Sequence, residues 1–184
     1  IADAWLRHDR PIHVPCDDSV LAVVDGQELP IRRSRGYAPM PVALPVEVVP
    51  ALAAGGDLKN TFCVAQGRYA WLSGHIGDMD DLATQQAFDG AVTQLTALVE
   101  VHPTRLVADC HPGYRSAGWA RRRAVQLGLD PPATVQHHHA HLASVLAEHG
   151  QDGATEVLGI AFDGTGYGDD GAVWGGEGML ADYT

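Results

Sequence analysis

The stretch LGIAFDGTGYGDDGAVWGG (158–176) indicates the fold, because it joins an apolar strand, an acidic residue in a glycine-rich turn and a second strand. An earlier stretch, ALAAGGDLKNTFCVAQG (51–67), follows the same plan. Glycines let backbone N–H groups approach a phosphate closely and adopt positive φ. Two copies of one unit, separated by helices, predict a duplicated two-lobed α/β protein in which each lobe presents one turn to a phosphate. Chance similarity between two glycine-rich hairpins is the alternative.

Hydrophobic periodicity and turn residues predict the elements around these two units. Asp25-Gly26 predicts a hairpin between strands at 19–24 and 29–33, and the prolines of 38–45 predict an extended connector. A glycine-rich strand and turn is expected at 171–180. Further strands are expected at 48–57, 60–66, 68–74, 105–109 and 157–163. Apolar residues recurring every three or four positions predict helices at 81–100, 118–128 and 136–149.

The composition is that of a globular protein, with 46% apolar and 19% charged residues. A formal net charge of −11 argues against general nucleic-acid binding, which requires a basic surface. No apolar run approaches the roughly 20 residues of a membrane span. Cys16, Cys63 and Cys110 form no CxxC pair, which indicates reduced thiols and a cytoplasmic setting. Because the sequence does not begin with methionine, we expect it to start inside a longer protein.

The segment QHHHAH (136–141) is the candidate metal site. His137 and His141 are four residues apart and therefore share one face of a helix, where two imidazoles can bind one divalent ion. The rival pair is His138 with His141. We assign His137 and His141 as ligands because they fall on the polar side of the helix, whereas His138 is four residues before Leu142 and falls on the buried stripe. A helix that merely begins with several histidines is the alternative.

Two histidines do not complete a metal site, because Zn²⁺ or Fe²⁺ takes four or more ligands. Asp163 lies at the end of a buried strand and before Gly-Thr-Gly, so it is the best third ligand. An Asx turn that leads into the glycines is an equally simple role for this residue.

The two glycine-containing turns supply the candidate nucleotide contacts. Lys59 is the sole lysine of the chain and lies beside Asn60 in the first turn, where its charge suits a phosphate. A solvated lysine and a plain hairpin turn are the alternatives. The candidates in the second turn are Gly164, Thr165, Gly166 and Gly168.

The segment DCHPGY (109–114) follows a buried strand, where α/β sheets place functional groups. Asp109 and His111 are therefore expected to line the cleft as catalytic residues together with Lys59. An ordinary turn set by Pro112-Gly113 explains the segment equally well.

Taken together and in this order, five motifs resemble the HypF family of carbamoyltransferases, which mature [NiFe] hydrogenases. They are GGDLKNTF, SGHIGDMDD, DCHPGY, QHHHAHLASVLAEHG and AFDGTGYGDDGAVWGGE. The resemblance implies the actin-like, ribonuclease H-like duplicated ATPase fold. Residues 45–184 would form its first lobe and the opening hairpin of the second. On RPI, CDDSV and RRSRGYAPMPVALP, residues 1–44 resemble the tail of a YrdC-like domain.

The resemblance also implies a reaction. Carbamoyl phosphate gives carbamate, ATP and carbamate give carbamoyl adenylate and pyrophosphate, and the carbamoyl group passes to the C-terminal cysteine of the partner protein HypE. A metal held by His137, His141 and Asp163 would bind phosphate oxygens, and Lys59 with the 164–168 turn would hold the adenylate. A further aspartate ligand is expected beyond Thr184, so we expect residues 1–184 alone to be inactive.

Three other functions remain open from the sequence. An O-carbamoyltransferase would use the same site on a small-molecule hydroxyl. A non-catalytic metal-binding or docking module would keep only the histidine helix. A metallohydrolase would use His137, His141 and Asp163 with water, but it explains neither Lys59 nor the paired glycine turns.

Overall fold

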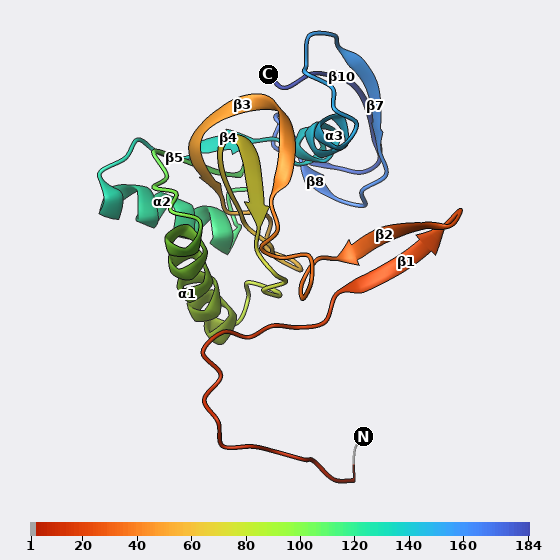
Figure 1. The fold of residues 1–184 in the computed structure, drawn as a ribbon. Coiled ribbons are helices and arrows are strands. Elements are labelled where there is room, and N and C mark those ends of the chain that lie inside the picture. The colour runs from red at the N-terminus through yellow and green to blue at the C-terminus, as the bar shows by residue number, and fades with distance from the viewer. Residues whose placement is uncertain (1–2) are drawn as a thin grey trace.

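A four-stranded sheet forms the centre of the computed structural model, which describes residues 3–184 (Figure 1). Its strand order is β4-β3-β5-β6. The β3–β4 pair is antiparallel, whereas β3, β5 and β6 run parallel, so the carboxyl ends of these three strands lie at one edge. The strands are β3 (Val42–Ala53), β4 (Cys63–Leu72), β5 (Arg105–Asp109) and β6 (Ala133–Val135).

Two helices, α1 (Leu82–Leu98) and α2 (Arg115–Leu127), pack on one side of this sheet and enclose the main core (Figure 1). Phe88 of α1 is fully buried and meets Phe62 and Trp119 edge to face, with ring centroids 5.3 and 4.8 Å apart. Such T-shaped aromatic pairs stabilise a core beyond the apolar area they bury. The two helices are therefore fixed to each other through one aromatic cluster.

The third helix, α3 (His137–Glu148), lies on the other side of the sheet beside a second, two-stranded sheet (Figure 1). In that sheet β7 (Val157–Ala161) pairs antiparallel with β10 (Glu177–Ala181). Between them, β8 (Gly166–Tyr167) and β9 (Val173–Trp174) form a short hairpin. Leu142 of α3 packs so closely on Gly159 of β7 that a Cβ there would lie 2.3 Å from its Cδ1 atom.

The predicted N-terminal hairpin is confirmed: β1 (Val20–Val24) pairs with β2 (Gln27–Arg32) and projects away from the sheet (Figure 1). Asp25 and Gly26 have φ values of 51° and 78°, the left-handed conformation that a tight hairpin turn requires. Within residues 3–184 no helix has both the length and the apolar character needed to cross a membrane.

The strands differ from the sequence prediction in several places. Residues 60–66 and 68–74 were expected as two strands, but β4 is continuous, because Gly67 (φ 59°) bends the strand without ending it. Residues 42–45 of the expected connector belong to β3, whose pairing with β4 is irregular around Pro45 and Pro50. The short strands β6 and β8 were not predicted, and the strand and turn expected at 171–180 contain two strands, β9 and β10.

The helices also differ in detail. The helix expected at 118–128 begins three residues earlier, at Arg115, and ends at Gly128 in the left-handed conformation, as predicted. Leu98 and Val145 continue the apolar periodicity that predicted α1 and α3, but they are 64% and 50% exposed, because each lies at the margin of its helix's buried face. The stripe on α3 consists of His138, Leu142 and Leu146.

Candidate metal and phosphate site

The candidate site lies where the carboxyl ends of β3, β5 and β6 meet, the usual position for ligands in α/β sheets. The GGDLKN turn follows β3, Asp109 ends β5, and His137 begins α3 directly after β6. Gly56 in this turn packs near His137, because a Cβ there would lie 4.0 Å from the His137 Cε1 atom. The parallel register therefore gathers residues that are far apart in the sequence.

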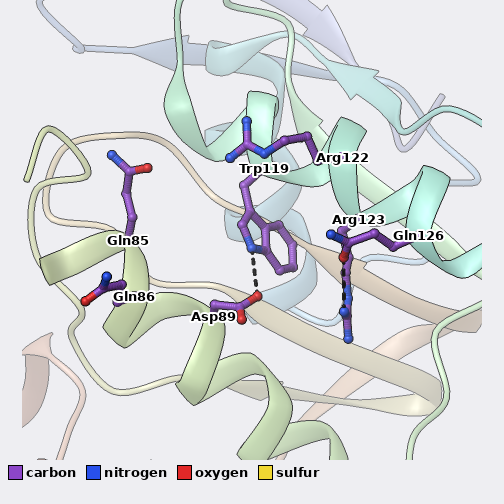
Figure 2. Close-up of a pocket in the computed structure, with 7 residues that line it drawn as sticks. All are labelled: Gln85, Gln86, Asp89, Trp119, Arg122, Arg123 and Gln126. Atoms are coloured by element: carbon purple, nitrogen blue, oxygen red, sulfur yellow. Dashed lines mark hydrogen bonds between the residues drawn. The ribbon is translucent and has the colours of Figure 1, made fainter. Parts of the chain in front are cut away.

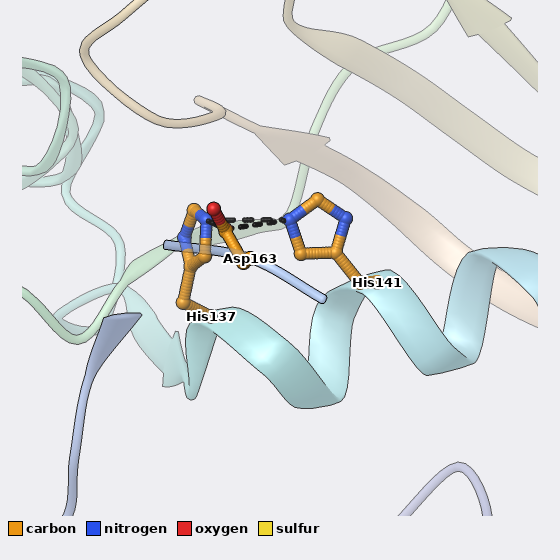
Figure 3. Close-up of side chains that lie close together, drawn as sticks. All are labelled: His137, His141 and Asp163. Atoms are coloured by element: carbon orange, nitrogen blue, oxygen red, sulfur yellow. Dashed lines mark hydrogen bonds and ion pairs between the residues drawn. The ribbon is translucent and has the colours of Figure 1, made fainter. Parts of the chain in front are cut away.

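The structure brings together all three predicted metal ligands, as Figure 3 shows. The Asp163 Oδ2 atom lies 2.8 Å from His137 Nε2 and 3.2 Å from His141 Nε2, and the two Nε2 atoms are 3.3 Å apart. The three side chains retain some exposure, with His141 the most open at 57%. A ligand or ion can therefore reach them from solvent.

Asp109 lies behind His137 as an outer partner. Its Oδ2 atom accepts a hydrogen bond from His137 Nδ1 at 2.6 Å, and its Oδ1 atom accepts one from the His111 backbone N–H at 2.8 Å. The side chain is only 8% exposed. A carboxylate on one ring nitrogen of a histidine fixes the tautomer and makes the other nitrogen a better metal ligand. The predicted catalytic residue Asp109 is thus placed to orient a ligand.

The electrostatics of the triad favour a cation. When His137 donates its Nδ1–H to Asp109, its Nε2 lone pair points at the Asp163 carboxylate, so two acceptors face each other. Burial would raise the pKa of Asp163, but the Gly164 N–H and the imidazoles of His137 and His141 outweigh it and lower this pKa. The carboxylate is therefore available as a ligand, and a proton or a metal ion is needed between the acceptors.

His138 is buried, as predicted. It is 0% exposed, its ring stacks on Trp174 with 13° between the planes, and its Nδ1 atom is 3.0 Å from the Gln136 amide. A Cβ on Gly166 would lie 2.3 Å from the His138 Cε1 atom. This contact joins the start of α3 to the second glycine turn.

In the first turn, Lys59 and Asn60 have different environments. Lys59 is exposed, has a positive φ of 48°, and donates its backbone N–H to Asp78. Asn60 is 1% exposed and donates from its amide to the carbonyls of Ala54 and Gly56 at 2.9 and 2.6 Å. The Lys59 ammonium group is thus available to bind an anion, whereas Asn60 fixes the shape of the turn.

In the second turn, two of the predicted residues are exposed and two are packed. Gly164 and Thr165 face solvent beside Asp163, and the Gly164 N–H donates to the Asp163 Oδ1 atom at 2.8 Å. Gly166 and Gly168 are buried, and a Cβ on Gly168 would collide with Trp174. These last two glycines therefore allow close packing of the turn on α3 and β9.

His111 lies in an aromatic group beside the triad. Its ring stacks on Tyr114, with centroids 4.2 Å apart, and meets Tyr167 edge to face at 5.1 Å. Its Nδ1 atom accepts the Gly113 N–H at 3.1 Å. The ring is not part of the His137–His141–Asp163 cluster.

Comparison with known proteins identifies the family of this chain. The profile of the HypF Kae1-like domain matches residues 47–148, and that of the second subdomain of the carbamoyltransferase Kae1-like domain matches residues 159–184. The chain belongs to the HypF family. It is 48% identical over 178 residues to the carbamoyltransferase HypF of Synechocystis sp., and 34% identical over 182 residues to the probable carbamoyltransferase HypF of Methanocaldococcus jannaschii.

Two solved HypF structures share the fold. The crystal structure of full-length HypF in the phosphate- and nucleotide-bound form has a TM-score of 0.85 and 46% identity, covering 99% of this chain and 28% of that one. The structure of T. kodakarensis HypF has a TM-score of 0.81 and 38% identity, covering 91% and 22%. The sequence alignments above cover 96% and 98% of this chain but 22% and 23% of the two relatives. The chain thus spans about a quarter of the length of the curated HypF relatives it matches.

The predicted fold is therefore confirmed: the chain has the α/β fold of the HypF Kae1-like domain. The assignment of residues 1–44 to a YrdC-like tail stays a prediction. Its expected boundary falls inside β3, and the HypF profile begins at residue 47.

Two residues that cap helices beside the site were not predicted from the sequence. Asp57 is buried after β3, and its carboxylate accepts the backbone N–H groups of Arg115 and Ser116 at 2.8 and 2.9 Å. It thereby caps α2, whose own N-cap residue makes no side-chain bond. Gln136 caps α3 by accepting the His139 N–H at 2.8 Å. The role of Gln136 could have been predicted from its position at the start of the expected helix. The role of Asp57 could not, because its contacts are with residues far away in the sequence.

Proposed function

We propose that this chain supplies the metal-binding part of the active site of a HypF-type carbamoyltransferase. The observation that carries the proposal is the triad of His137, His141 and Asp163, with Asp109 bonded behind His137. The family assignment supports the transferase class, because the curated relatives are named carbamoyltransferases.

The triad fits a divalent transition metal. Two imidazole nitrogens and a carboxylate oxygen lie within 4.8 Å of one another, and such a nitrogen and oxygen set suits Zn²⁺ or Fe²⁺. When bound, the ion would supply Lewis acidity to a phosphate or carbamoyl oxygen. Protein residues would orient it: Asp109 holds the His137 ring, and the Gly164 N–H holds the Asp163 carboxylate.

The nucleotide would be held by the two turns that flank the triad. Lys59 would place its ammonium group on a phosphate, and the exposed backbone at Gly164 and Thr165 would approach the adenylate. A HypF structure in the phosphate- and nucleotide-bound form supports this role for the fold. The proposed substrates are carbamoyl phosphate and ATP, which give carbamoyl adenylate and pyrophosphate. We propose the C-terminal cysteine of a HypE-type protein, in [NiFe] hydrogenase maturation, as the acceptor.

The decisive experiment is carbamoyl-phosphate-dependent exchange of pyrophosphate into ATP, measured in a protein of HypF length that carries this sequence. His141→Ala is expected to abolish exchange and to lower metal content. His149→Ala, at the exposed end of the same helix, is the matched control and is expected to leave both unchanged. Exchange that persists in His141→Ala without metal would refute the proposal. Hydrolysis of carbamoyl phosphate with no dependence on ATP would instead indicate a metallohydrolase.

A further inference from the structure

A second concave site lies between the helices α1 and α2 (Figure 2). It has a volume of about 330 Å³, and Gln85 and Asp89 of α1 face Trp119, Arg122, Arg123 and Gln126 of α2. None of the candidate site residues lines it. We call it the helix groove.

The charge of the helix groove is opposite to that of the protein. The charged residues that line the groove are two arginines, Arg122 and Arg123, and one aspartate, Asp89, which gives it a net charge of +1, whereas the whole chain carries −11. Within residues 3–184 no ion pair involves Arg121, Arg122 or Arg123. Unpaired guanidinium groups gathered on one helix of an acidic protein favour an anionic ligand.

Hydrogen bonds hold the polar walls of the groove in place. Asp89 is tied to the wall, because its Oδ1 atom accepts the Trp119 indole N–H at 3.1 Å. Arg123 donates to the Gln126 Oε1 atom at 3.3 Å, which leaves the Gln126 amide N–H groups as donors toward a ligand. The Arg122 guanidinium has no protein partner among the hydrogen bonds of the described chain. Arginine recognises carboxylates through two parallel N–H bonds, so Arg122 and Arg123 suit that group.

An apolar cavity of about 180 Å³ adjoins the groove, because Trp119 and Arg123 line both. Its other walls are mainly aliphatic and come from the sheet, α1, the 101–106 segment and the end of α2. They include Leu52, Val92, Val101, Leu106 and Leu127. The groove lined by Arg122 and Arg123 thus borders a hydrophobic cavity, and the largely buried Trp119 forms part of the wall of both.

We propose that the helix groove binds an acidic peptide segment of a partner protein, with a carboxylate side chain on Arg122 and Arg123 and an aliphatic side chain in the adjoining cavity. A nucleic acid fits less well, because it would not fill the adjoining apolar cavity. The inference is independent of the proposed carbamoyl transfer, since the groove shares no residue with that site.

The probe for this site is a fluorescein-labelled peptide of alternating glutamate and leucine, titrated with the 184-residue chain and followed by fluorescence anisotropy. Arg122→Glu/Arg123→Glu is expected to weaken binding at least about tenfold. The control, Arg7→Glu/Arg10→Glu, makes the same change in net charge on the exposed N-terminal segment and is expected to stay within about twofold. Circular dichroism of each variant confirms folding.

Four outcomes would overturn the inference. The first is no saturable binding of the glutamate–leucine peptide. The second is equal weakening by both double variants, which would indicate only long-range charge. The third is tighter binding of a single-stranded DNA oligonucleotide with the same dependence on Arg122 and Arg123. A peptide of alternating glutamine and leucine should bind more weakly than the acidic one, and equal binding would likewise exclude the carboxylate contact.

Discussion

The Nδ1 atom of His137, the first residue of α3, lies 2.6 Å from the Oδ2 atom of Asp109, the last residue of β5. This contact depends on the parallel pairing of β5 with β6, which places Asp109 opposite Val135, just before the helix. The sheet register therefore orients the imidazole that we propose as a metal ligand.

Asp109→Asn is expected to weaken metal binding about 10- to 100-fold, because an amide cannot accept both the His137 Nδ1–H and the His111 N–H as the carboxylate does. Competition with a chromophoric chelator measures the affinity. Asp130→Asn, which changes an exposed carboxylate elsewhere, serves as the control. If the affinities of the two variants are equal, Asp109 does not position the ligand.

Three of the four histidines at the start of α3 are expected to fall into two classes. His137→Ala and His141→Ala should each abolish metal binding, because they remove ligand atoms next to Asp163. His138→Ala should retain the metal but lower the free energy of unfolding by about 2–3 kcal/mol, because it leaves a cavity beneath Trp174 and Gly166. Elemental analysis and urea denaturation distinguish these effects. Loss of metal in His138→Ala with retention in His137→Ala would reverse the assignment.

The site shows which features a sequence can predict. The sharing of one helix face by His137 and His141, and the burial of His138, follow from local helical periodicity, and the structure shows both. The contact of Asp109 with His137 and the capping of α2 by Asp57 depend on which strands pair and in what register. No local pattern contains that information.

The same distinction applies to the fold. The hairpin turn at Asp25-Gly26 and the helix end at Gly128 were predicted because each residue has a local conformational reason to be there. The strand β6 has three residues, too few for a detectable alternation, and it exists because β5 offers it a parallel partner. Gly67 was misinterpreted as a turn because glycine adopts positive φ readily and is therefore found both in turns and in bulges.

Lys59→Met is expected to lower the kcat/KM of carbamoyl adenylate formation about a hundredfold while leaving metal content unchanged, because it removes a charge aimed at phosphate and no metal ligand. The measurement is pyrophosphate exchange in a HypF-length protein carrying this sequence. Lys59→Arg retains the charge and should recover part of the rate. Unchanged kinetics in Lys59→Met would remove this residue from the site.

The three cysteines are expected to differ in reactivity toward iodoacetamide. Burial raises the pKa of the Cys63 thiol to about 11, and Cys16 is exposed. Because only the thiolate reacts, Cys63 should be alkylated more than about a hundredfold more slowly than an ordinary exposed thiol at pH 8. Its rate should rise as the pH approaches its pKa. Cys110, whose pKa is also raised by burial, should react more slowly than Cys16. Peptide mass spectrometry over time follows each site, and equal rates would contradict the burial of Cys63.

Gly166→Ala and Gly164→Ala form a matched pair in the second glycine turn. A Cβ on Gly166 would lie 2.3 Å from His138 Cε1, and this fully buried ring cannot move away without disturbing Trp174. A Cβ on Gly164 would meet no atom within 4 Å. Neither glycine requires a positive φ, so the difference between the variants reports packing alone.

Gly166→Ala should therefore lower the free energy of unfolding by about 1–3 kcal/mol, and Gly164→Ala should change it by less than about 0.5 kcal/mol. Urea denaturation measures both, and equal stabilities would show that His138 does not pack against this turn.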